Sequence, residues 1–574
     1  MKKRWFLWVG ALLMSVTATA QVEKQVEVTK AYVPSLERAE KLSIEPDMTD
    51  TTTLRPDIDY TITPLALQTA LATRTIRPAT VTYWEFNRPR PFYLKAAAGI
   101  PLQSAVDFYA ATQNASTGYA IGYLHHEGRY GKLKNDFEIK SRATRMTNRI
   151  GAAAGTYLGN HILEGDISYR HRLDRRYGMY YPADVMAPGA KIGYSDANLA
   201  LRIGDDFLNL DRVNFEVALD GSLFIDHSDP TGIYARGNQL NFGARAKVAH
   251  TFGKQQLMAH VAYRYMGGLK GMDSWKEQLI LIGLRYGVER PGSLFELGAD
   301  FCHDYVYNAH ITDGSESGNY ILPFARYEFD LARKALKPFI EVDSHLQTND
   351  FQSLTELNPY VGSGHWLSGA TIDYAARGGL KGSFGRDRFA YRLYADFTLR
   401  KNHIYQTLME VDEKLPEGYN AGYMVPIRAR LMWFGLGGEL TYRPTTALTF
   451  EASALLRSFD EDTDLPVGES ELTAELGVRY AGRKFRFGVR GVLASERAWG
   501  IWPQVISLAT DANPATGRFE VPLAVDVQAD FEWIASSSMT LFVEGRNLAN
   551  QDIYRFAGFR EYGINALVGV RMIF

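Results

Sequence analysis

The chain has 574 residues and a formal net charge of −2, which excludes nucleic-acid recognition through net charge; no nucleic-acid partner is expected. Glycine, tyrosine and phenylalanine are abundant, with 51, 33 and 30 residues, and this composition suits strands and tight turns. Beyond the N-terminus, no run of about 18 residues lacks charged side chains, which argues against membrane-spanning helices. Strands of a β-barrel can still cross a membrane, because only every second residue must be apolar.

The first 20 residues predict a secretory signal peptide. Basic residues at positions 2–4 precede an apolar run at 5–16, and small residues at 18–20 predict cleavage after Ala20. The alternative, a retained membrane helix, requires a longer apolar run. The single cysteine, Cys302, leaves an exported chain without an intramolecular disulfide, so its stability must come from another source.

Residues 21–90 form a leader that differs from the rest of the chain. It contains no glycine, because the next glycine after Gly10 is Gly99. Its regularly spaced prolines disfavour long helices and central strands. We predict an extended periplasmic or lumenal segment with one short helix at 33–44. Two interpretations stay open: a mobile linker, or a segment bound along the barrel mouth, inside the lumen, or to a periplasmic or outer-membrane protein.

From residue 91 to 574 the pattern becomes a series of amphipathic strands. Residues 213–225, 389–399, 519–533 and 564–574 each place apolar side chains on one face and mixed or polar ones on the other. The last strand ends on an aromatic, Phe574. Strands as long as 519–533 exceed those of soluble sandwiches, whose domain-sized repeats are also missing from this sequence.

Short turns alternate with longer polar stretches along this region. Hairpin turns are predicted at 252–255, 289–292 and 481–484. The longer polar stretches are 174–189, 310–317, 347–364, 460–469 and 496–517. Such alternation is typical of the two ends of an outer-membrane barrel. The predicted fold class is all-β: a large antiparallel transmembrane β-barrel of about 20–22 strands, with an even number expected and about 16 or 18 still open.

The last two strands carry a short motif that combines a strand, an Asn-Leu-Ala-Asn turn and an aromatic C-terminus. Residues 543–550 read Val-Glu-Gly-Arg-Asn-Leu-Ala-Asn, Tyr554 follows, and the final strand ends at Phe574. This arrangement resembles TonB-dependent outer-membrane receptors. The resemblance implies a Gram-negative cell outer membrane, contact with its lipid, and recognition of the terminal strand by the barrel-assembly machinery. The start at Gln21 and the tyrosine-rich barrel are similar to proteins of the Bacteroidetes group.

The N-terminal part departs from the same family. TonB-dependent receptors carry a glycine-rich plug domain before the barrel, whereas residues 21–90 are shorter and free of glycine. We therefore expect a receptor-like barrel that lacks its plug. Residues 25–30 are similar to the short segment that contacts TonB, but without a plug to unfold the usual energised import is not expected.

Other residue groups were weighed as chemical sites. His125 and His126 are neighbours on a strand and face opposite ways, which makes them poor partners for one metal ion. Asp343, Ser344 and His345 have catalytic residue types without triad geometry, and residues 377–380 lack the Lys-Ser/Thr of a phosphate loop. No catalytic, cofactor-binding or metal-binding residue is predicted, and the protein is not expected to be an enzyme.

Charges of both signs gather on the lumen face of the C-terminal strands. They are Arg479, Arg486, Arg490, Arg571, Glu471, Glu475, Asp526, Asp530 and Glu532. Paired, they would partly close the lumen; hydrated, they would line a channel. Two functions therefore stay open. One is transport or binding of a solute at the cell surface, with a partner as gate, and the alternative is a non-transport structural or assembly subunit of an outer-membrane complex.

Overall fold

The computed structural model describes most of the predicted barrel region. The described residues are 90–112, 117–136, 138–178, 189–207, 212–229, 236–309, 314–332, 334–361, 369–410, 421–461, 467–502 and 517–574. The predicted signal peptide and residues 21–89 of the leader lie outside them. No helix in these ranges is long and apolar enough to cross a membrane.

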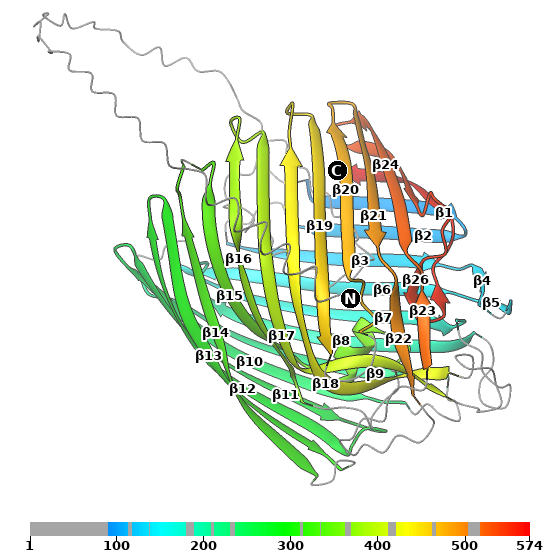
Figure 1. The fold of residues 1–574 in the computed structure, drawn as a ribbon, viewed down its shortest axis with the longest axis horizontal. Helices are drawn as coiled ribbons and strands as arrows, with labels where there is room; N and C mark the ends of the chain where they lie inside the picture. Colours follow the sequence, from blue (N-terminus) through cyan, green and yellow to red (C-terminus); the bar gives the residue numbers. More distant parts are fainter. Residues whose placement is uncertain are drawn as a thin grey trace, which may run out of the picture. The chain divides into compact units, whose positions relative to one another are not determined.

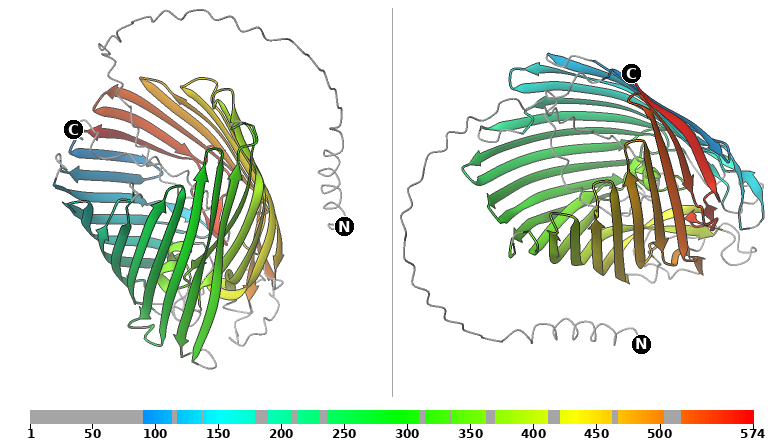
Figure 2. Two further views of the ribbon diagram at one scale, coloured as in Figure 1. Left: turned by 90° about the vertical axis from the view of Figure 1, so that its left-hand side faces the viewer. Right: turned by 90° about the horizontal axis from the view of Figure 1, so that it is seen from above.

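The strands close into one antiparallel barrel of 22 strands, as the alternating pattern predicts (Figures 1 and 2). Closure joins the first strand, β1 (Phe92–Ile100), to the last, β28 (Asn565–Ile573). Between them the wall runs through β2 (Gln103–Ala111), β3 (Gly118–Arg129), β6 (Arg145–Leu158), β7 (His161–Arg176), β8 (Ala190–Gly204), β9 (Asn214–Asp226), β10 (Gln239–Phe252), β11 (Gln255–Gly268), β12 (Trp275–Arg290), β13 (Ser293–Asn308), β14 (Ser315–Phe329), β15 (Lys337–Gln347), β16 (Thr371–Phe384), β17 (Phe389–Glu410), β18 (Ala421–Tyr442), β19 (Leu448–Glu461), β20 (Leu472–Ala481), β21 (Phe485–Ala494), β24 (Ala524–Ser536) and β25 (Met539–Arg546).

One end of the barrel carries short turns and the other carries long connections. The three predicted hairpins are confirmed as β10–β11, β12–β13 and β20–β21. In the first, Gly253 adopts a φ of 64°, a left-handed conformation that glycine adopts without strain. The strand termini meet at this short-turn end, where the backbones of Phe92 and Phe574 bond to each other at 3.0 Å.

The long-loop end carries the remaining small elements. They are β4 (Lys132–Lys134), β5 (Lys140–Arg142), α2 (Phe351–Leu357), β22 (Arg497–Trp502), β23 (Gly517–Val521), β26 (Tyr554–Phe556) and β27 (Phe559–Arg560). The long connections are therefore concentrated at one end of the barrel, and the candidate site lies among them.

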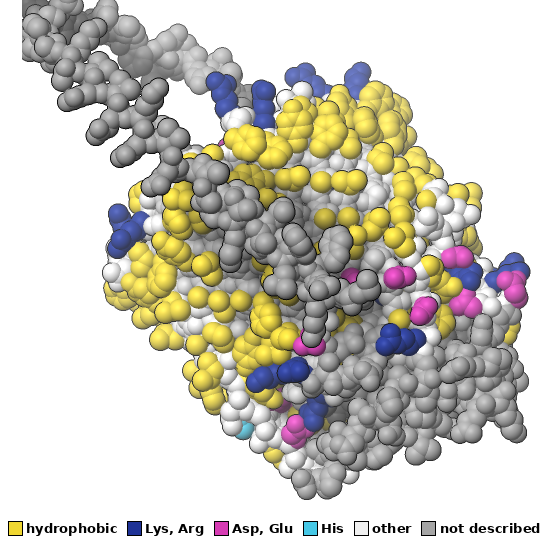
Figure 3. Space-filling view, viewed as in Figure 1, with side chains coloured by type: hydrophobic (Ala, Val, Ile, Leu, Met, Phe, Trp, Pro, Cys, Tyr) yellow, Lys and Arg dark blue, Asp and Glu magenta, His cyan; other side chains and the backbone are white. Residues whose placement is uncertain are grey.

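The outer wall is apolar, as the strand patterns predict. Leu219, Leu393 and Val568 are 43%, 51% and 57% exposed on that face, whereas Asp396, one strand position away from Phe397, is buried toward the lumen. Figure 3 shows hydrophobic side chains spread over the visible part of this wall. An apolar outer band of this kind is what a bilayer requires.

The prediction of one continuous strand over residues 519–533 is wrong. The chain breaks at Pro522 and Leu523 into β23 and β24. Proline has no N–H to donate to the strand ladder. On the N-terminal side of the break, Val521 pairs with Arg497 of β22. Val521 is buried and the Phe519 ring lies 6.1 Å from that of Tyr554, so this end of the apolar face packs inside the protein.

Candidate functional site

The connection between β15 and β16, a long polar stretch by sequence, folds around the short helix α2. Asp350 caps its N-terminus and accepts a hydrogen bond from the Ser353 N–H at 3.1 Å. At the other end, the Asn358 N–H donates to the Leu354 carbonyl at 2.8 Å. Figure 2 shows α2 enclosed by the ring of strands. Local capping therefore satisfies backbone and side-chain groups at both ends of this short helix, which makes no strand pairing with the barrel wall.

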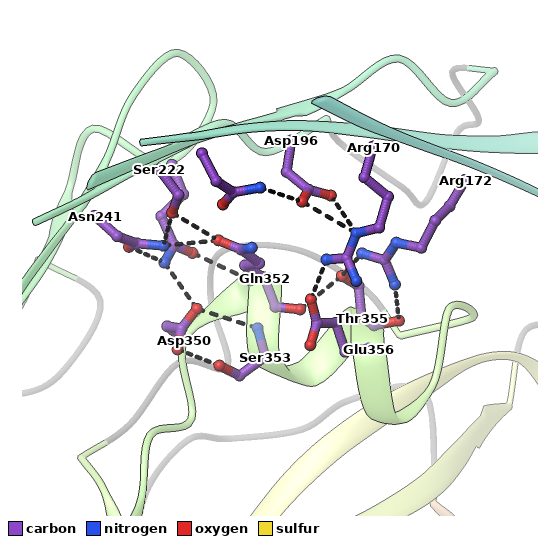
Figure 4. Close-up of polar contacts among 12 residues, drawn as sticks. Arg170, Arg172, Asp196, Ser222, Asn241, Asp350, Gln352, Ser353, Thr355 and Glu356 are labelled. Carbon is purple, nitrogen blue, oxygen red and sulfur yellow. Dashed lines mark hydrogen bonds and ion pairs between the residues drawn. The ribbon is translucent and has the colours of Figure 1, made fainter. Parts of the chain in front are cut away.

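Two arginines of β7 hold α2 against the wall (Figure 4). The Arg170 guanidinium lies 2.9 Å from Asp196 of β8 and also pairs with Glu356 of the helix. Arg172 donates to both the carbonyl and the hydroxyl oxygen of Thr355, each at 3.1 Å. Asp196 is only 1% exposed, so its charge depends on this pairing.

Amides of β10 hold the first turn of the same helix. The Gln239 side-chain amide donates to Asp350 at 2.8 Å, and the Asn241 amide donates to Gln352 at 2.7 Å (Figure 4). The Ser222 hydroxyl of β9 reaches Gln352 at 3.3 Å. Side chains from the neighbouring strands β7 to β10 therefore attach α2 to one sector of the wall.

The other side of α2 packs into an apolar cluster inside the barrel. Phe351 is fully buried, with its ring edge-on to Tyr194 and Phe224 at centroid distances of 6.2 and 5.7 Å. Further buried members are Ile192, Met266, Met272, Trp275, Leu279, Cys302, Val306, Leu354 and Ile372. The lumen face is thus apolar around α2 at the long-loop end. Sequence reasoning missed this, although Ile192 and Tyr194 place two large apolar side chains on one face of β8 there.

A second segment, residues 547–564, enters the lumen from the motif that resembles TonB-dependent receptors. Asn547 adopts a φ of 48°, and its amide donates to the carbonyls of Gln551 and Tyr562 at 2.8 and 3.1 Å. Asparagine tolerates this left-handed backbone better than most residues. The motif therefore shapes the root of an inward segment that carries β26 and β27.

Glu561 anchors the second segment to the wall. Its carboxylate lies 3.4 Å from Arg129 and 3.2 Å from Arg145. Burial raises the pKa of this carboxyl, but the attraction of Arg145 and Arg129 outweighs it, and the net pKa lies below its ordinary value. Nearby, the Tyr562 hydroxyl donates to the Ala143 carbonyl at 3.0 Å. The charged form of Glu561 is therefore the one the fold requires.

The two segments meet through an aromatic stack. The rings of Tyr360 and Phe559 lie 3.5 Å apart, inclined by 14°. Arg176 of β7 donates to the Tyr360 carbonyl at 3.2 Å, and the Tyr194 hydroxyl donates to the Pro359 carbonyl at 2.9 Å. We call residues 348–361 and 547–564 together the inner layer. The inner layer joins two segments that are far apart in the sequence, inside the long-loop end of the barrel.

Five of the predicted lumen charges form ion pairs between nearby strands. Arg571 and Arg486 contact Glu532 at 3.0 and 3.8 Å, and Arg490 contacts Glu475 at 2.8 Å. The strands concerned, β20, β21, β24 and β28, are adjacent or separated by one strand in the wall. These ion pairs run along the wall, whereas the contacts of the inner layer join residues that project from the wall into the lumen.

The histidines weighed as metal ligands have separate partners. His125 bonds to Asp107, while the two ring nitrogens of His126 lie 2.7 Å from the Ser104 hydroxyl and 2.6 Å from the Asn148 amide oxygen. Within the described ranges, no three His, Cys, Asp or Glu side chains gather in a way that could hold a metal ion.

The other weighed groups are parts of ordinary strands. His345 contacts Asp373 of the next strand at 3.1 Å, and the buried Ser344 between it and Asp343 belongs to the same strand, β15. Neighbouring positions on a strand face opposite ways, so the structure does not bring these residues together as a triad. Residues 377–380 lie inside β16.

No family model and no curated protein sequence matches the chain. Solved structures do match. The FrpB iron transporter from Neisseria meningitidis (F3-3 variant) aligns with a TM-score of 0.63 and 10% identity, over 85% of this chain and 82% of that one. The copper transporter OprC aligns with a TM-score of 0.62 and 13% identity, over 84% and 80%.

A third match is FpvA from Pseudomonas aeruginosa, in a structure bound to heterologous pyoverdines. Its TM-score is 0.60 at 10% identity, and the alignment covers 84% of this chain and 71% of that one. All three are TonB-dependent receptors. The chain therefore has the barrel fold of these outer-membrane receptors, and the resemblance predicted from its last strands is confirmed.

Proposed function

We propose that the chain is an outer-membrane transport barrel of the TonB-dependent receptor type that closes its own lumen. The stack of Tyr360 on Phe559 carries this proposal, because it joins the two lumenal segments that project from different parts of the wall. A barrel this wide encloses a channel unless something fills it. In the proposed orientation the long-loop end faces the cell surface, so the inner layer closes the surface side.

The attachment of α2 supports a closure that opens. The polar contacts of α2 with β7, β9 and β10 are side-chain hydrogen bonds and ion pairs, such as those of Arg170 and Asn241, and not a backbone ladder. Side-chain contacts exchange for water at a smaller net cost than a strand pair. The solved relatives are named as iron and copper transporters, which supports a solute-transport role for this chain.

The leader belongs to the same proposal. Arg90 donates to the Ile573 carbonyl at 2.8 Å and also bonds to Ser538, so the leader joins the barrel at the short-turn end. We infer that export removes residues 1–20, that residues 21–90 replace the plug on the periplasmic side, and that they bind a periplasmic or outer-membrane partner. The β28 strand ending at Phe574 would be the segment that the barrel-assembly machinery binds.

A permanently closed barrel would fit the second candidate, a structural or assembly subunit. The apolar packing of Phe351 against Tyr194 and Phe224 supports it, because buried aromatic contacts of this kind are costly to break.

One crosslink separates the two candidates. In a Cys302→Ser background, Asn241→Cys and Gln352→Cys joined by a short bifunctional methanethiosulfonate reagent would lock α2 to the wall, since the native amide groups touch at 2.7 Å. In planar bilayers with KCl, a transport barrel should show brief openings that this reagent abolishes and reductant restores. Silence in both states, with a partner retained in mild detergent, would support the structural subunit. The single variants Asn241→Cys and Gln352→Cys are the matched controls.

Deletion of residues 22–88 tests the leader in the same recording. If the leader is a second gate, its removal should lengthen the openings, and unchanged openings would contradict that role.

A further inference from the structure

Basic side chains gather along one arc of the short-turn end. Exposed lysines and arginines occupy the successive turns from β10–β11 to β20–β21, namely Lys254, Arg290, Lys334, Arg386, Arg388, Arg443, Arg483 and Lys484. We call these residues the basic arc. Figure 3 shows Lys and Arg side chains standing along this edge of the barrel.

The arc has little counter-charge of its own. Within the described part of the chain, none of its members forms an ion pair, and the exposed carboxylates in the same turns are Glu289 and Asp387. The turns β6–β7 and β24–β25, elsewhere on the same rim, have uncharged tips at residues 159–160 and 537–538. The exposed cations of these turns therefore follow the rim from β10 to β21, and outside this stretch Arg90 lies beside the β24–β25 turn.

The arc lies directly beside a belt of exposed aromatics. Phe252, Phe384 and Phe485 are 59%, 51% and 47% exposed on the outer wall, and each is within two residues of an arc residue. Aromatic side chains of membrane barrels mark the boundary between hydrocarbon and headgroups. Flexible arginine and lysine side chains just beyond that boundary reach the level of the lipid phosphates.

We propose that the basic arc binds the phosphates of anionic phospholipids in the adjoining leaflet. The inference rests on the membrane orientation in the proposed function, in which this leaflet is the periplasmic one. Acidic residues of the leader, such as Asp57 and Asp59, are the competing occupant. The lipid is favoured because the arc adjoins the aromatic belt, where a bilayer must contact the protein.

The test uses the full chain in nanodiscs of mixed phosphatidylglycerol and phosphatidylcholine, with native mass spectrometry of the retained lipid. The variant Arg386→Gln, Arg443→Gln, Arg483→Gln neutralises three separate turns. A basic residue near an anionic surface contributes about 1 kcal/mol, so each lost charge should lower phosphatidylglycerol retention about fivefold. Replacing the same three residues by lysine should preserve it.

The matched control neutralises three exposed basic residues at the opposite end, Lys132→Gln, Lys140→Gln and Arg142→Gln, and should leave retention unchanged. Equal loss in the control, or equal retention of both lipids by the unmodified chain, would overturn the proposal. The competing occupant has its own signature: phosphatidylglycerol would bind only after deletion of residues 22–88. That result would also overturn it. The conductance tests of lumen closure do not depend on any of these outcomes.

Discussion

The inner layer and the basic arc treat charge in opposite ways. At the long-loop end, Asp196 is buried and paired with Arg170, and Glu561 is held by two arginines inside the lumen. At the short-turn end, arc residues such as Arg386 and Arg443 are exposed and form no ion pair within the described ranges. Buried charges need specific partners, whereas exposed ones are stabilised by water and by whatever they meet.

This difference separates structure from recognition. Removing a partner at the long-loop end should loosen the inner layer, because an unpaired buried charge is costly. Removing a charge of the basic arc should alter lipid binding and leave the fold intact. The following predictions test that division, from the largest expected effect to the smallest.

Phe559→Ala should have the largest effect on the inner layer. Phe559 is 1% exposed, and deleting a buried aromatic costs about 3–5 kcal/mol. Hydrogen–deuterium exchange of residues 349–361 should accelerate, since Tyr360 loses its stacking partner. The lipid-facing Leu393→Ala should leave this exchange unchanged. Unaltered exchange in Phe559→Ala would show that the stack does not hold the two segments together.

Arg170→Met should destabilise the inner layer slightly less than Phe559→Ala, by about 3 kcal/mol, because it leaves Asp196 without its cation. The loss is moderated because the Asn198 amide still donates to Asp196 at 3.1 Å. Hydrogen–deuterium exchange of α2 should again measure this loss of stability. Adding Asp196→Asn removes the stranded charge and should recover most of the loss; a double variant as loose as the single one would contradict this explanation.

Glu561 should make the inner layer acid-sensitive. The folded pKa of its carboxyl lies below the ordinary value of 4.5, so its stabilising effect is complete above that value. The effect is lost as the pH falls through the lower, folded pKa. Lumen closure, followed as KCl conductance between pH 7 and pH 3, should weaken at the acid end.

Glu561→Gln supplies the control for this pH dependence. The variant should be looser at pH 7 and should change less on acidification, because it has no carboxylate to protonate there. An identical acid response in both proteins would assign the effect to other groups.

Arg443→Gln should have the smallest effect on stability, within about 0.5 kcal/mol, because the side chain is exposed and unpaired among the described residues. The temperature at which the barrel loses its heat-modifiable mobility in gels should stay the same. A clear decrease in this temperature would mean that the basic arc stabilises the fold, which would contradict its assignment to binding alone.

The wall of the barrel could be predicted from the sequence, because each lipid-facing strand must repeat with a period of two. Residues 213–225 and 389–399 show this pattern; all but Val213 lie in β9 and β17. The same rule failed at residues 519–533, where Pro522 ends the ladder and the apolar face continues into the protein interior. Periodicity identifies an apolar face without identifying what covers it.

The inner layer could not be predicted in this way. Its contacts join residues far apart in the chain, such as Arg170 with Glu356 and Tyr360 with Phe559. No local pattern encodes such pairings. One signal was present: Ile192 and Tyr194 make the end of β8 apolar on its lumen face, where an open channel would be polar.

The conductance of the unmodified full chain in planar bilayers, compared with the double variant Tyr360→Ala, Phe559→Ala, tests the central claim most directly. A lumen closed by its inner layer predicts a silent baseline with brief openings for the unmodified chain, and a large steady conductance for the variant. A large steady conductance of the unmodified chain would contradict the account.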